Sequence, residues 1–236
     1  MALRAGTQWL ARGRGRLMKR TTILYGSILA VTVVIVALAS LRPIRVLPRI
    51  APAPGFALTD QDGNRLTSDD LRGSIVLFDF TYLSCQEPCN RTTATMREVQ
   101  EQLAAEPEDD PPVRLVTISF DPERDSVEAL KAAAEAAGAD PTRWTFATGD
   151  PDLMKLIVGR GFNVFYEQKP DGSFRFDPTL VLVDGWGVVR AEYRVGPPRA
   201  EHIVNDIRIV ANEARKSRGP ARLAYEATHL FVCRTR

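Results

Sequence analysis

Two cysteines, Cys85 and Cys89, lie four residues apart in a chain of 236 residues that holds only three cysteines. An apolar run from Ile75 to Phe80 leads into them, and a segment with helical spacing follows. A strand that leads to a cysteine pair at the start of a helix is typical of thiol redox chemistry or of soft-metal binding. Residues 74–100 are therefore the candidate functional site.

The spacing of the pair constrains its local structure. Residues four apart within a helix have Cβ atoms about 5–6 Å apart, whereas a disulfide needs about 3.8 Å. We therefore expect Cys85 in a loop and Cys89 in the first turn of a helix over 88–103. Free N–H groups and the helix dipole at that turn favour a thiolate. The alternative is a static disulfide, although so short a closed loop removes little entropy from the unfolded chain.

The same pair limits which metals are plausible. A structural zinc site needs four ligands, and no second Cys/His pair lies near these cysteines in the sequence. Cu(I) is softer and suits two thiolates. The chain has only two histidines, His202 at the start of the last expected helix and His229 in the tail, and both are expected to be surface or capping residues.

Charge and hydropathy predict a membrane anchor. Lysine plus arginine total 31 against 29 acidic residues, a balance that gives no reason to propose nucleic-acid binding. Residues 21–41 carry no charge and have the length of a bilayer span. The basic segment 1–20 is expected to stay in the cytoplasm, so the rest faces the extracytoplasmic side of the cell (inner) membrane as a single-pass protein. The alternatives are a cleaved signal peptide, with Ala37-Leu38-Ala39 as its cleavage site, and a buried core helix.

The remaining pattern predicts one α/β domain over 55–214. Residues 42–54 are expected to form a linker, and 215–236 a basic, partly apolar tail of unknown structure that contains Cys233. The predicted elements are a hairpin around Asp62-Gly63, strands at 75–80, 113–120 and 144–147, helices at 88–103, 126–137 and from 151, antiparallel strands at 163–166, 179–183 and 188–193, and a helix with apolar residues at 203, 204, 207, 210 and 214. This order is that of the thioredoxin fold, a mixed central sheet flanked by helices.

Several motifs in this domain are similar to those of the Sco/SenC (PrrC-like) family, membrane-anchored thioredoxin-fold proteins of cytochrome c oxidase copper-centre assembly. They are the opening GFALTDQDG at 55–63, Gly73 before the strand, Cys85-x-x-x-Cys89, and SFDPERD at 119–125. The resemblance covers 55–214. From residue types alone Asp121 and Asp125 form a solvated turn with a helix cap; the resemblance implies that they line the cysteine site.

Two positions depart from the family pattern. Asn90 follows the second cysteine where the family has proline, and Phe176 falls where the family's third copper ligand is a histidine. Asp177-Pro178-Thr179 resembles the segment before the strand that faces the cysteines in thioredoxins, which predicts a cis bond before Pro178. The pair Cys85 and Cys89 would then hold Cu(I) with the third ligand missing, and Cu(II) only weakly.

The expected function is support of cytochrome c oxidase copper-centre assembly by thiol–disulfide exchange, which would make the protein a thiol–disulfide oxidoreductase. Cys85 is expected to attack and Cys89 to resolve the mixed disulfide; the reverse holds if the helix dipole dominates at Cys89. The expected partner is an oxidase subunit with thiol copper ligands or another copper carrier. The alternatives are a copper chaperone that binds Cu(I) through the pair, a thiol peroxidase, and a non-catalytic assembly module.

Overall fold

The computed structural model describes residues 23–33, 45–105, 110–194 and 199–216. The chain divides into two compact units, Met1–Arg45 and Val46–Arg236. In the first unit residues 23–33 are helical. Among the described residues, no helix has both the length and the apolarity that a bilayer crossing needs. Residues 1–22 and 34–44, which include both ends of the expected span, lie outside the described residues, as does most of the expected tail, 217–236.

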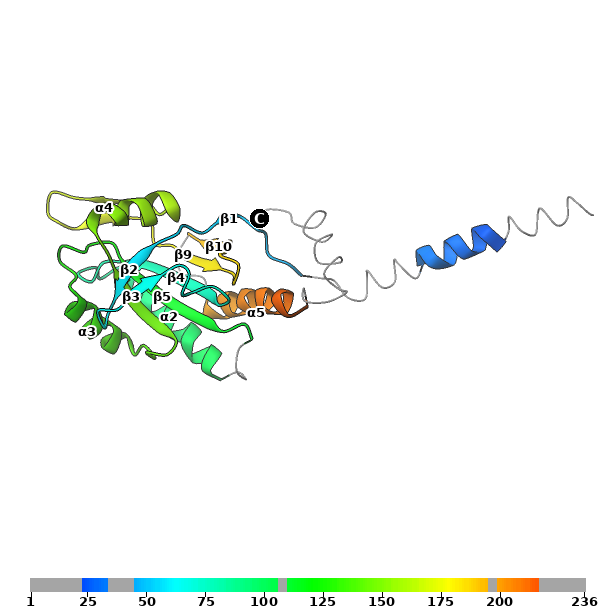
Figure 1. The fold of residues 1–236 in the computed structure, drawn as a ribbon, viewed down its shortest axis with the longest axis horizontal. Coiled ribbons are helices and arrows are strands. Elements are labelled where there is room, and N and C mark those ends of the chain that lie inside the picture. The colour runs from blue at the N-terminus through cyan, green and yellow to red at the C-terminus, as the bar shows by residue number, and fades with distance from the viewer. Residues whose placement is uncertain (1–22, 34–44, 106–109, 195–198, 217–236) are drawn as a thin grey trace, which may run out of the picture. The chain divides into compact units, whose positions relative to one another are not determined.

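The second unit is a mixed α/β fold around an eight-stranded sheet, with strand order β1-β10-β9-β4-β5-β6-β2-β3 (Figure 1). The strands of this sheet are β1 (Ala51–Pro52), β2 (Ala57–Asp60), β3 (Arg65–Thr67), β4 (Ile75–Thr81), β5 (Val113–Ser119), β6 (Trp144–Thr148), β9 (Leu180–Val183) and β10 (Val188–Tyr193). The hairpin β7 (Tyr166–Gln168) and β8 (Phe174–Phe176) forms a separate sheet. The helices are α2 (Cys89–Ala104), α3 (Val127–Ala137), α4 (Pro151–Met154), a π-helix (Lys155–Gly161) that continues α4, and α5 (Ala200–Lys216).

Strand β4 lies in the interior of this sheet, between β9 and β5, and all seven of its residues are buried. It pairs in parallel with β5, from Ile75 opposite Val113 to Thr81 opposite Ser119, and antiparallel with β9. A strand buried on both faces needs a nearly continuous apolar run, which is what the sequence has here. The register places the ends of β4 and β5 side by side, so the loops that follow them leave the sheet at the same edge.

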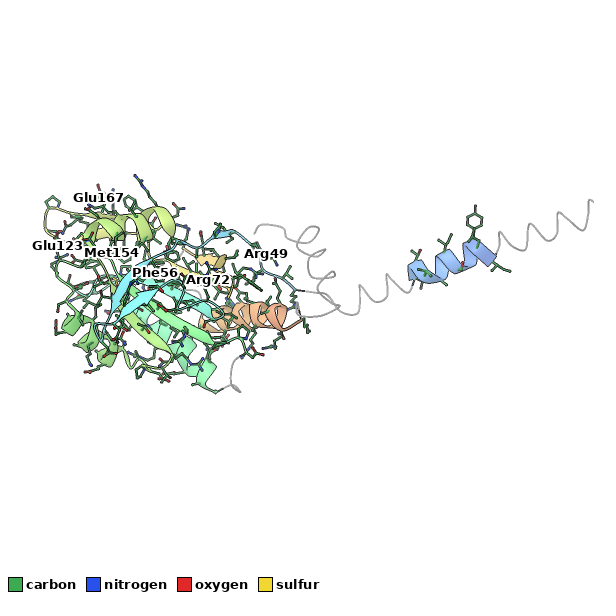
Figure 2. The ribbon with its side chains drawn as sticks, viewed as in Figure 1. Arg49, Phe56, Arg72, Glu123, Met154 and Glu167 are labelled. Carbon is green, nitrogen blue, oxygen red and sulfur yellow. A yellow bond between two sulfur atoms is a disulfide. The ribbon has the colours of Figure 1, made fainter. Side chains whose placement is uncertain are left out.

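Apolar layers cover both faces of the sheet. On one face, α2, α3 and α5 pack their buried residues against Ile75 and Leu77 of β4 and against Leu115 of β5. On the other face, Met154 of α4 and residues of the π-helix pack with Phe56 and Phe78. Figure 2 labels Met154 at α4 and Phe56 in the neighbouring region of the strands. The core therefore has two layers, and α2 begins at the edge where β4 ends.

A buried cluster of charged side chains holds the first residues of the second unit against its sheet. Arg190 of β10 donates to Asp184 at 3.0 Å and to Glu213 of α5 at 2.6 Å, and all three side chains are buried. The same guanidinium donates to the carbonyl oxygens of Leu47 and Pro48. Part of the segment expected to be a linker is thus held on the domain, where β1 pairs with β10.

The expected element order agrees well with this fold. The parallel strands, the hairpin of β2 and β3, and α3, capped by Ser126 and closed by Gly138 in the left-handed region, are confirmed. The strand expected at 163–166 is wrong in its bounds: Asn163 has a φ of 54° and β7 begins only at Tyr166. A β-conformation is incompatible with that backbone angle, which asparagine adopts more readily than most other residues.

Replacing Arg190 with alanine should lower the free energy of unfolding by about 3–5 kcal/mol, because buried Asp184 loses its ion-pair partner and Glu213 loses its contact at 2.6 Å while the contact with Arg49 at 3.5 Å remains. Urea unfolding followed by circular dichroism measures the change. Lys131→Ala is the matched control: its pair with Asp62 is exposed, so the expected loss is below about 1 kcal/mol. Equal losses in the two variants would contradict the role assigned to the buried cluster.

Candidate functional site

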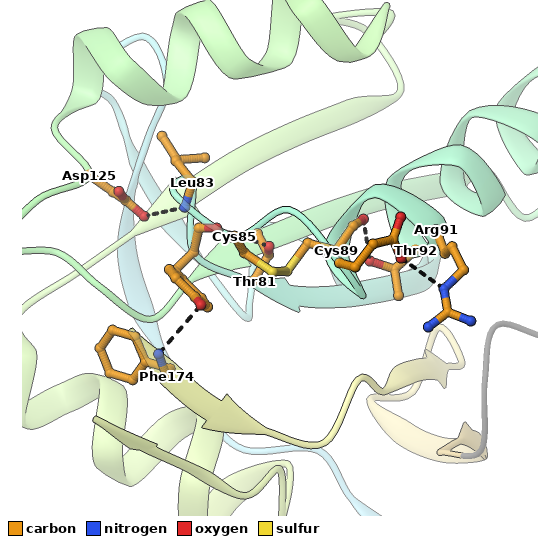
Figure 3. The surroundings of a disulfide bond; sticks show 10 residues. Thr81, Leu83, Cys85, Cys89, Arg91, Thr92, Asp125 and Phe174 are labelled. Carbon is orange, nitrogen blue, oxygen red and sulfur yellow. Dashed lines mark hydrogen bonds and ion pairs between the residues drawn. A yellow bond between two sulfur atoms is a disulfide. The ribbon is translucent and has the colours of Figure 1, made fainter. Parts of the chain in front are cut away.

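Cys85 and Cys89 form a disulfide with an S–S distance of 2.00 Å and a Cα–Cα distance of 5.9 Å (Figure 3). As expected, Cys85 lies in the loop after β4 and Cys89 in the first turn of α2. Pro88 precedes that turn, and Asn90 N–H donates to the carbonyl oxygen of Gln86. Cys85 is partly exposed and Cys89 is 5% exposed. An incoming thiolate therefore has better access to the sulfur of Cys85.

A groove opens beside the disulfide, between the start of α2 and the end of α3. Both cysteines line it, together with Thr81, Tyr82, Leu83, Asn90, Thr93, Ala94, Arg97, Ala133, Ala136, Ala137 and Phe146. Arg97 crosses between the helices and donates from Nε to the carbonyl oxygen of Ala137 at 2.7 Å. The disulfide is therefore reachable from a concave surface made mostly of small and polar side chains, which a chain segment of a partner protein can approach closely.

Asp125 supports the cysteine loop from behind. Its Oδ2 accepts from the backbone N–H of Leu83 at 2.9 Å (Figure 3) and from the hydroxyl of Ser119. Burial raises the pKa of Asp125 above its ordinary value, although both hydrogen bonds act in the opposite direction. The contact joins the loop after β5 to the loop after β4, two residues before Cys85.

Asp121, which was also expected to line the cysteine site, does not bond the cysteine loop but pairs with Arg124. It is 3% exposed and forms an ion pair with Arg124. Arg124 also donates to the carbonyl oxygen of Gly172, in the turn between β7 and β8. Neither Asp121 nor Asp125 lines the groove; Asp125 positions the cysteine loop, and Asp121 positions the arginine that holds the β7–β8 hairpin.

Phe176, at the position of the expected third ligand, belongs to an aromatic cluster. Its ring centroid is 6.0 Å from that of Tyr82 and 5.3 Å from that of Phe120. Phe174 joins the same cluster, and its backbone N–H donates to the hydroxyl of Tyr82. Tyr82 and Cys85 both contact this core layer. The β7–β8 hairpin therefore meets the cysteine loop through rings that offer no donor nitrogen to a metal.

The expectation of a cis bond before Pro178 is wrong. Among the described residues the cis peptide bonds are Glu87–Pro88 and Asp110–Pro111. X-Pro bonds prefer the trans form by about 0.5–1 kcal/mol. The prediction of a cis bond rested only on the resemblance of this segment to thioredoxins. The segment is held in another way: Asp177 N–H donates to Phe165 O, and the Thr179 hydroxyl donates to Asp177 O.

Few side chains near the disulfide could bind copper. No cluster of three or more His, Cys, Asp or Glu side chains suited to a metal occurs in the part of the chain that the structure describes. His202 is exposed on α5, and His229 lies outside the described residues. With Phe176 in an aromatic cluster, the donors at the site are two sulfurs, which suit Cu(I) once the disulfide is reduced and do not suit Cu(II).

Asp79 is a site residue that the sequence analysis did not identify. It lies in β4, is fully buried, and accepts from Thr117 at 3.5 Å. Burial raises its pKa to about 7, against hydrogen bonds from Thr92, the backbone of Phe80 and Thr117. Thr92 in turn donates to the carbonyl oxygen of Cys89 at 3.0 Å. The sequence did contain a signal for it: Asp79 is a single carboxylate within an apolar strand that leads to the cysteines.

The strand order, the α2 crossover and the C-x-x-x-C disulfide at the start of α2 define a thioredoxin-like protein with a dithiol site. Residues 49–212 match the family model described as SCO1/SenC. The chain therefore belongs to the SCO1/SenC family, as its motifs indicated.

Individual members show the same similarity. The chain is 35% identical over 157 residues to the SCO1 protein homolog of Bacillus subtilis, covering 65% of this chain and 79% of the relative. The solved structure of BsSco, described as a member of the Sco family of cytochrome c oxidase assembly proteins with a disulfide switch, is 26% identical with a TM-score of 0.61, covering 71% of this chain and 98% of that one. ScoI of Bradyrhizobium japonicum, solved with copper bound, is 26% identical with a TM-score of 0.58 and covers 68% of this chain and 99% of that one.

Asp125→Ala should lower the free energy of unfolding by about 1–3 kcal/mol, because the Leu83 N–H loses its acceptor. The decisive measurement is amide hydrogen exchange at Leu83, which should lose protection relative to the β4 amides. Asp125→Asn keeps an acceptor oxygen and should retain most of that protection. Unchanged exchange at Leu83 in Asp125→Ala would show that this contact does not hold the loop.

Proposed function

We propose that this protein supports assembly of the cytochrome c oxidase copper centre as a thiol–disulfide oxidoreductase. Its substrate would be a disulfide of an oxidase subunit with thiol copper ligands, or of another copper carrier. One observation carries the proposal: a disulfide between accessible Cys85 and buried Cys89 opens on a groove, while Phe176 leaves the pair without a third donor. The description of BsSco as an oxidase assembly protein with a disulfide switch supports it.

The exchange transfers two electrons and needs no metal. In the reduced protein the Cys85 thiolate attacks one sulfur of the partner's disulfide, and the partner's other sulfur leaves as a thiolate that takes a proton from water. Cys89, as a thiolate, then attacks the sulfur of Cys85. The Cys85–Cys89 bond forms, the mixed disulfide breaks, and the partner is left with two thiols. The partly exposed position of Cys85 and the buried position of Cys89 favour these roles.

Copper delivery is the second candidate. It is favoured by the solved ScoI structure with copper bound and by two adjacent sulfurs that, when reduced, suit Cu(I). Copper would then be cargo held by Cys85 and Cys89 and passed to thiols of the partner. A thiol peroxidase and a non-catalytic assembly module are further outcomes that the experiments below separate.

The proposed location follows from the sequence. The uncharged segment 21–41 would anchor the chain in the cell membrane, with the basic segment 1–20 in the cytoplasm. The domain would then face the extracytoplasmic side, where disulfides persist. A separate reductant would have to keep the pair reduced there, because exchange with an oxidised partner consumes the dithiol.

Thiol–disulfide exchange should require both cysteines, and replacing each one should block a different step. In a Cys233→Ser background, Cys85→Ser should abolish reduction of a disulfide peptide, whereas Cys89→Ser should accumulate the mixed disulfide on Cys85, because the resolving thiol is missing. Mass spectrometry of the trapped adduct measures this. Neither variant should support oxidase assembly in a host that depends on the protein. Normal assembly with both serine variants would refute the proposal, and peroxide consumption without exchange would favour the peroxidase.

Phe176→His should add a copper donor where the family has one. The reduced parent should bind Cu(I) alone or no copper, and the variant should gain Cu(II) binding with sulfur-to-copper charge-transfer absorption, because Cu(II) prefers ligand sets that contain nitrogen. Phe174→His, on the same strand, is the matched control and should not gain it. Stable Cu(II) binding by the parent would mean that another residue completes the site, and copper delivery would then replace exchange as the leading function.

A further inference from the structure

The turn between β9 and β10 presents a tryptophan to solvent. Trp186 is 77% exposed, the largest exposed fraction of any large apolar side chain in the described part of the second unit. Its backbone is held in place, because its N–H donates to Asp184 Oδ1 at 2.9 Å and its carbonyl oxygen accepts from Arg72. These contacts use backbone atoms that other residues also supply, so the turn itself does not require an indole ring.

This turn lies at the edge of the sheet where β4 begins, opposite the edge that carries the cysteines. β4 starts at Ile75 and ends at Thr81. Val183, the last residue of β9, pairs with Val76 at the start of β4. The loop before β4 also contacts the turn, since Gly73 N–H donates to the carbonyl oxygen of residue 185. Trp186 and the disulfide are therefore at opposite ends of the central strand.

The first residues of the second unit reach the same edge. Ile50 N–H donates to Val189 O at 2.9 Å, and Ala53 N–H donates to Gly187 O at 2.8 Å. The end of α5 lies there too, because Arg215 donates to the carbonyl oxygen of residue 110, shortly before β5. Figure 1 shows the segment before β1 and the end of α5 at one end of this unit.

Exposed side chains at this edge combine apolar rings and chains with positive charge. Ile50 is 49% exposed beside Trp186. Glu213 and Asp184 are buried with Arg190, and the exposed acidic residues nearby are 69, 70 and 110. The flanking chain adds arginines at 42, 45 and 218. We call the following exposed residues the basal surface: Arg49, Ile50, Arg72, Trp186, Arg215 and Lys216.

The length of the chain before the domain limits how far the basal surface can be from a bilayer. The proposed anchor ends at Leu41, and Val46 follows it by five positions. Five fully extended residues span at most about 17 Å. Arg190 binds the carbonyl oxygens of Leu47 and Pro48, so the fold holds the chain from this point onward. An anchored domain must therefore keep this end near the membrane.

We propose that the basal surface rests on anionic phospholipid at the membrane–water interface. This inference rests on the proposed anchor and is independent of the exchange chemistry. Trp186 and Ile50 enter the headgroup region, where tryptophan is favoured because its ring is apolar and its N–H is polar. The basic side chains contact the lipid phosphates, to which juxtamembrane arginine and lysine are attracted.

This orientation directs the disulfide away from the bilayer. The seven residues of β4 rise about 3.3 Å each, which places the cysteine edge on the order of 20 Å above the basal surface. In Figure 2 Glu123 and Glu167 are labelled at the end of the domain away from Arg49. The groove beside Cys85 then opens to the extracytoplasmic solution, where a segment of a partner protein can reach it.

The test measures contact of Trp186 with lipid in the full-length Trp9→Phe chain, reconstituted in bilayers of phosphatidylcholine and phosphatidylglycerol. The remaining indoles are Trp186 and Trp144, and Trp144 is 0% exposed. Lipids with brominated acyl chains quench an indole that lies close to them. They should remove most of the Trp186 emission and leave that of Trp144, which Trp186→Phe measures separately.

A tryptophan at the opposite edge provides the matched control for position. Phe165 is 48% exposed, and its carbonyl oxygen accepts from Asp177 N–H in the segment before β9. β9 begins opposite Asp79, near the cysteine end of β4. Phe165→Trp, made in the Trp186→Phe chain, should therefore not be quenched by the brominated lipids.

Charge variants test which lipid is recognised. Arg215→Gln combined with Lys216→Gln should reduce quenching of Trp186 to the level found in phosphatidylcholine alone. Lys155→Gln combined with Lys169→Gln removes the same charge from exposed positions in the π-helix and in the β7–β8 turn, and should leave the quenching unchanged.

Each contrary outcome overturns a different statement. An unquenched Trp186 in a chain that stays in the bilayer through an alkaline wash would overturn this inference and leave the anchor standing. Equal quenching of the Phe165→Trp chain would overturn the fixed orientation. Quenching that is the same with and without phosphatidylglycerol would overturn the assignment of an anionic lipid. Loss of the chain in the alkaline wash would overturn the anchor, and this inference with it.

Discussion

The parallel pairing of β4 with β5 is the constraint on which the site depends. Because their carboxyl ends share an edge, the cysteine loop and the loop that carries Asp125 emerge side by side. One hydrogen bond, from Leu83 N–H to Asp125, then joins them. The crossover that parallel pairing requires is α2, and its first turn carries Cys89. The disulfide, its groove and its supporting carboxylate are thus consequences of one strand pairing.

Membership of a family does not by itself determine which chemistry a member performs. The relatives include a protein solved with copper bound and one described by a disulfide switch. In this chain the rings of Phe176, Phe174 and Tyr82 pack together beside the cysteine loop. An aromatic ring stabilises the hairpin against the domain by apolar contact, but it supplies no lone pair to a metal. Thiol–disulfide exchange between the two sulfurs needs no metal ligand, which is why exchange is the better proposal.

Two buried charged groups show contrasting ways in which the fold handles polar atoms. Arg190 is surrounded by two carboxylates and two carbonyl oxygens, so its charge is fully compensated. Asp79 has only weak partners and one oxygen without any. The first arrangement is what a structural cluster needs. The second is costly for stability.

The sequence by itself determined the order of the main helices and of the central strands, the loop and helix positions of Cys85 and Cys89, and the absence of a histidine at Phe176. These follow from local spacing, apolar periodicity and residue type, which act over a few residues. Only the tertiary structure decided that Asp125 holds the cysteine loop, that Asp121 instead holds Arg124, and that Asp79 is fully buried in the central strand. It also placed residues 46–54 on the domain and left the bond before Pro178 trans. Those facts depend on contacts between segments far apart in the chain, and no local pattern encodes which partner a buried polar group will meet.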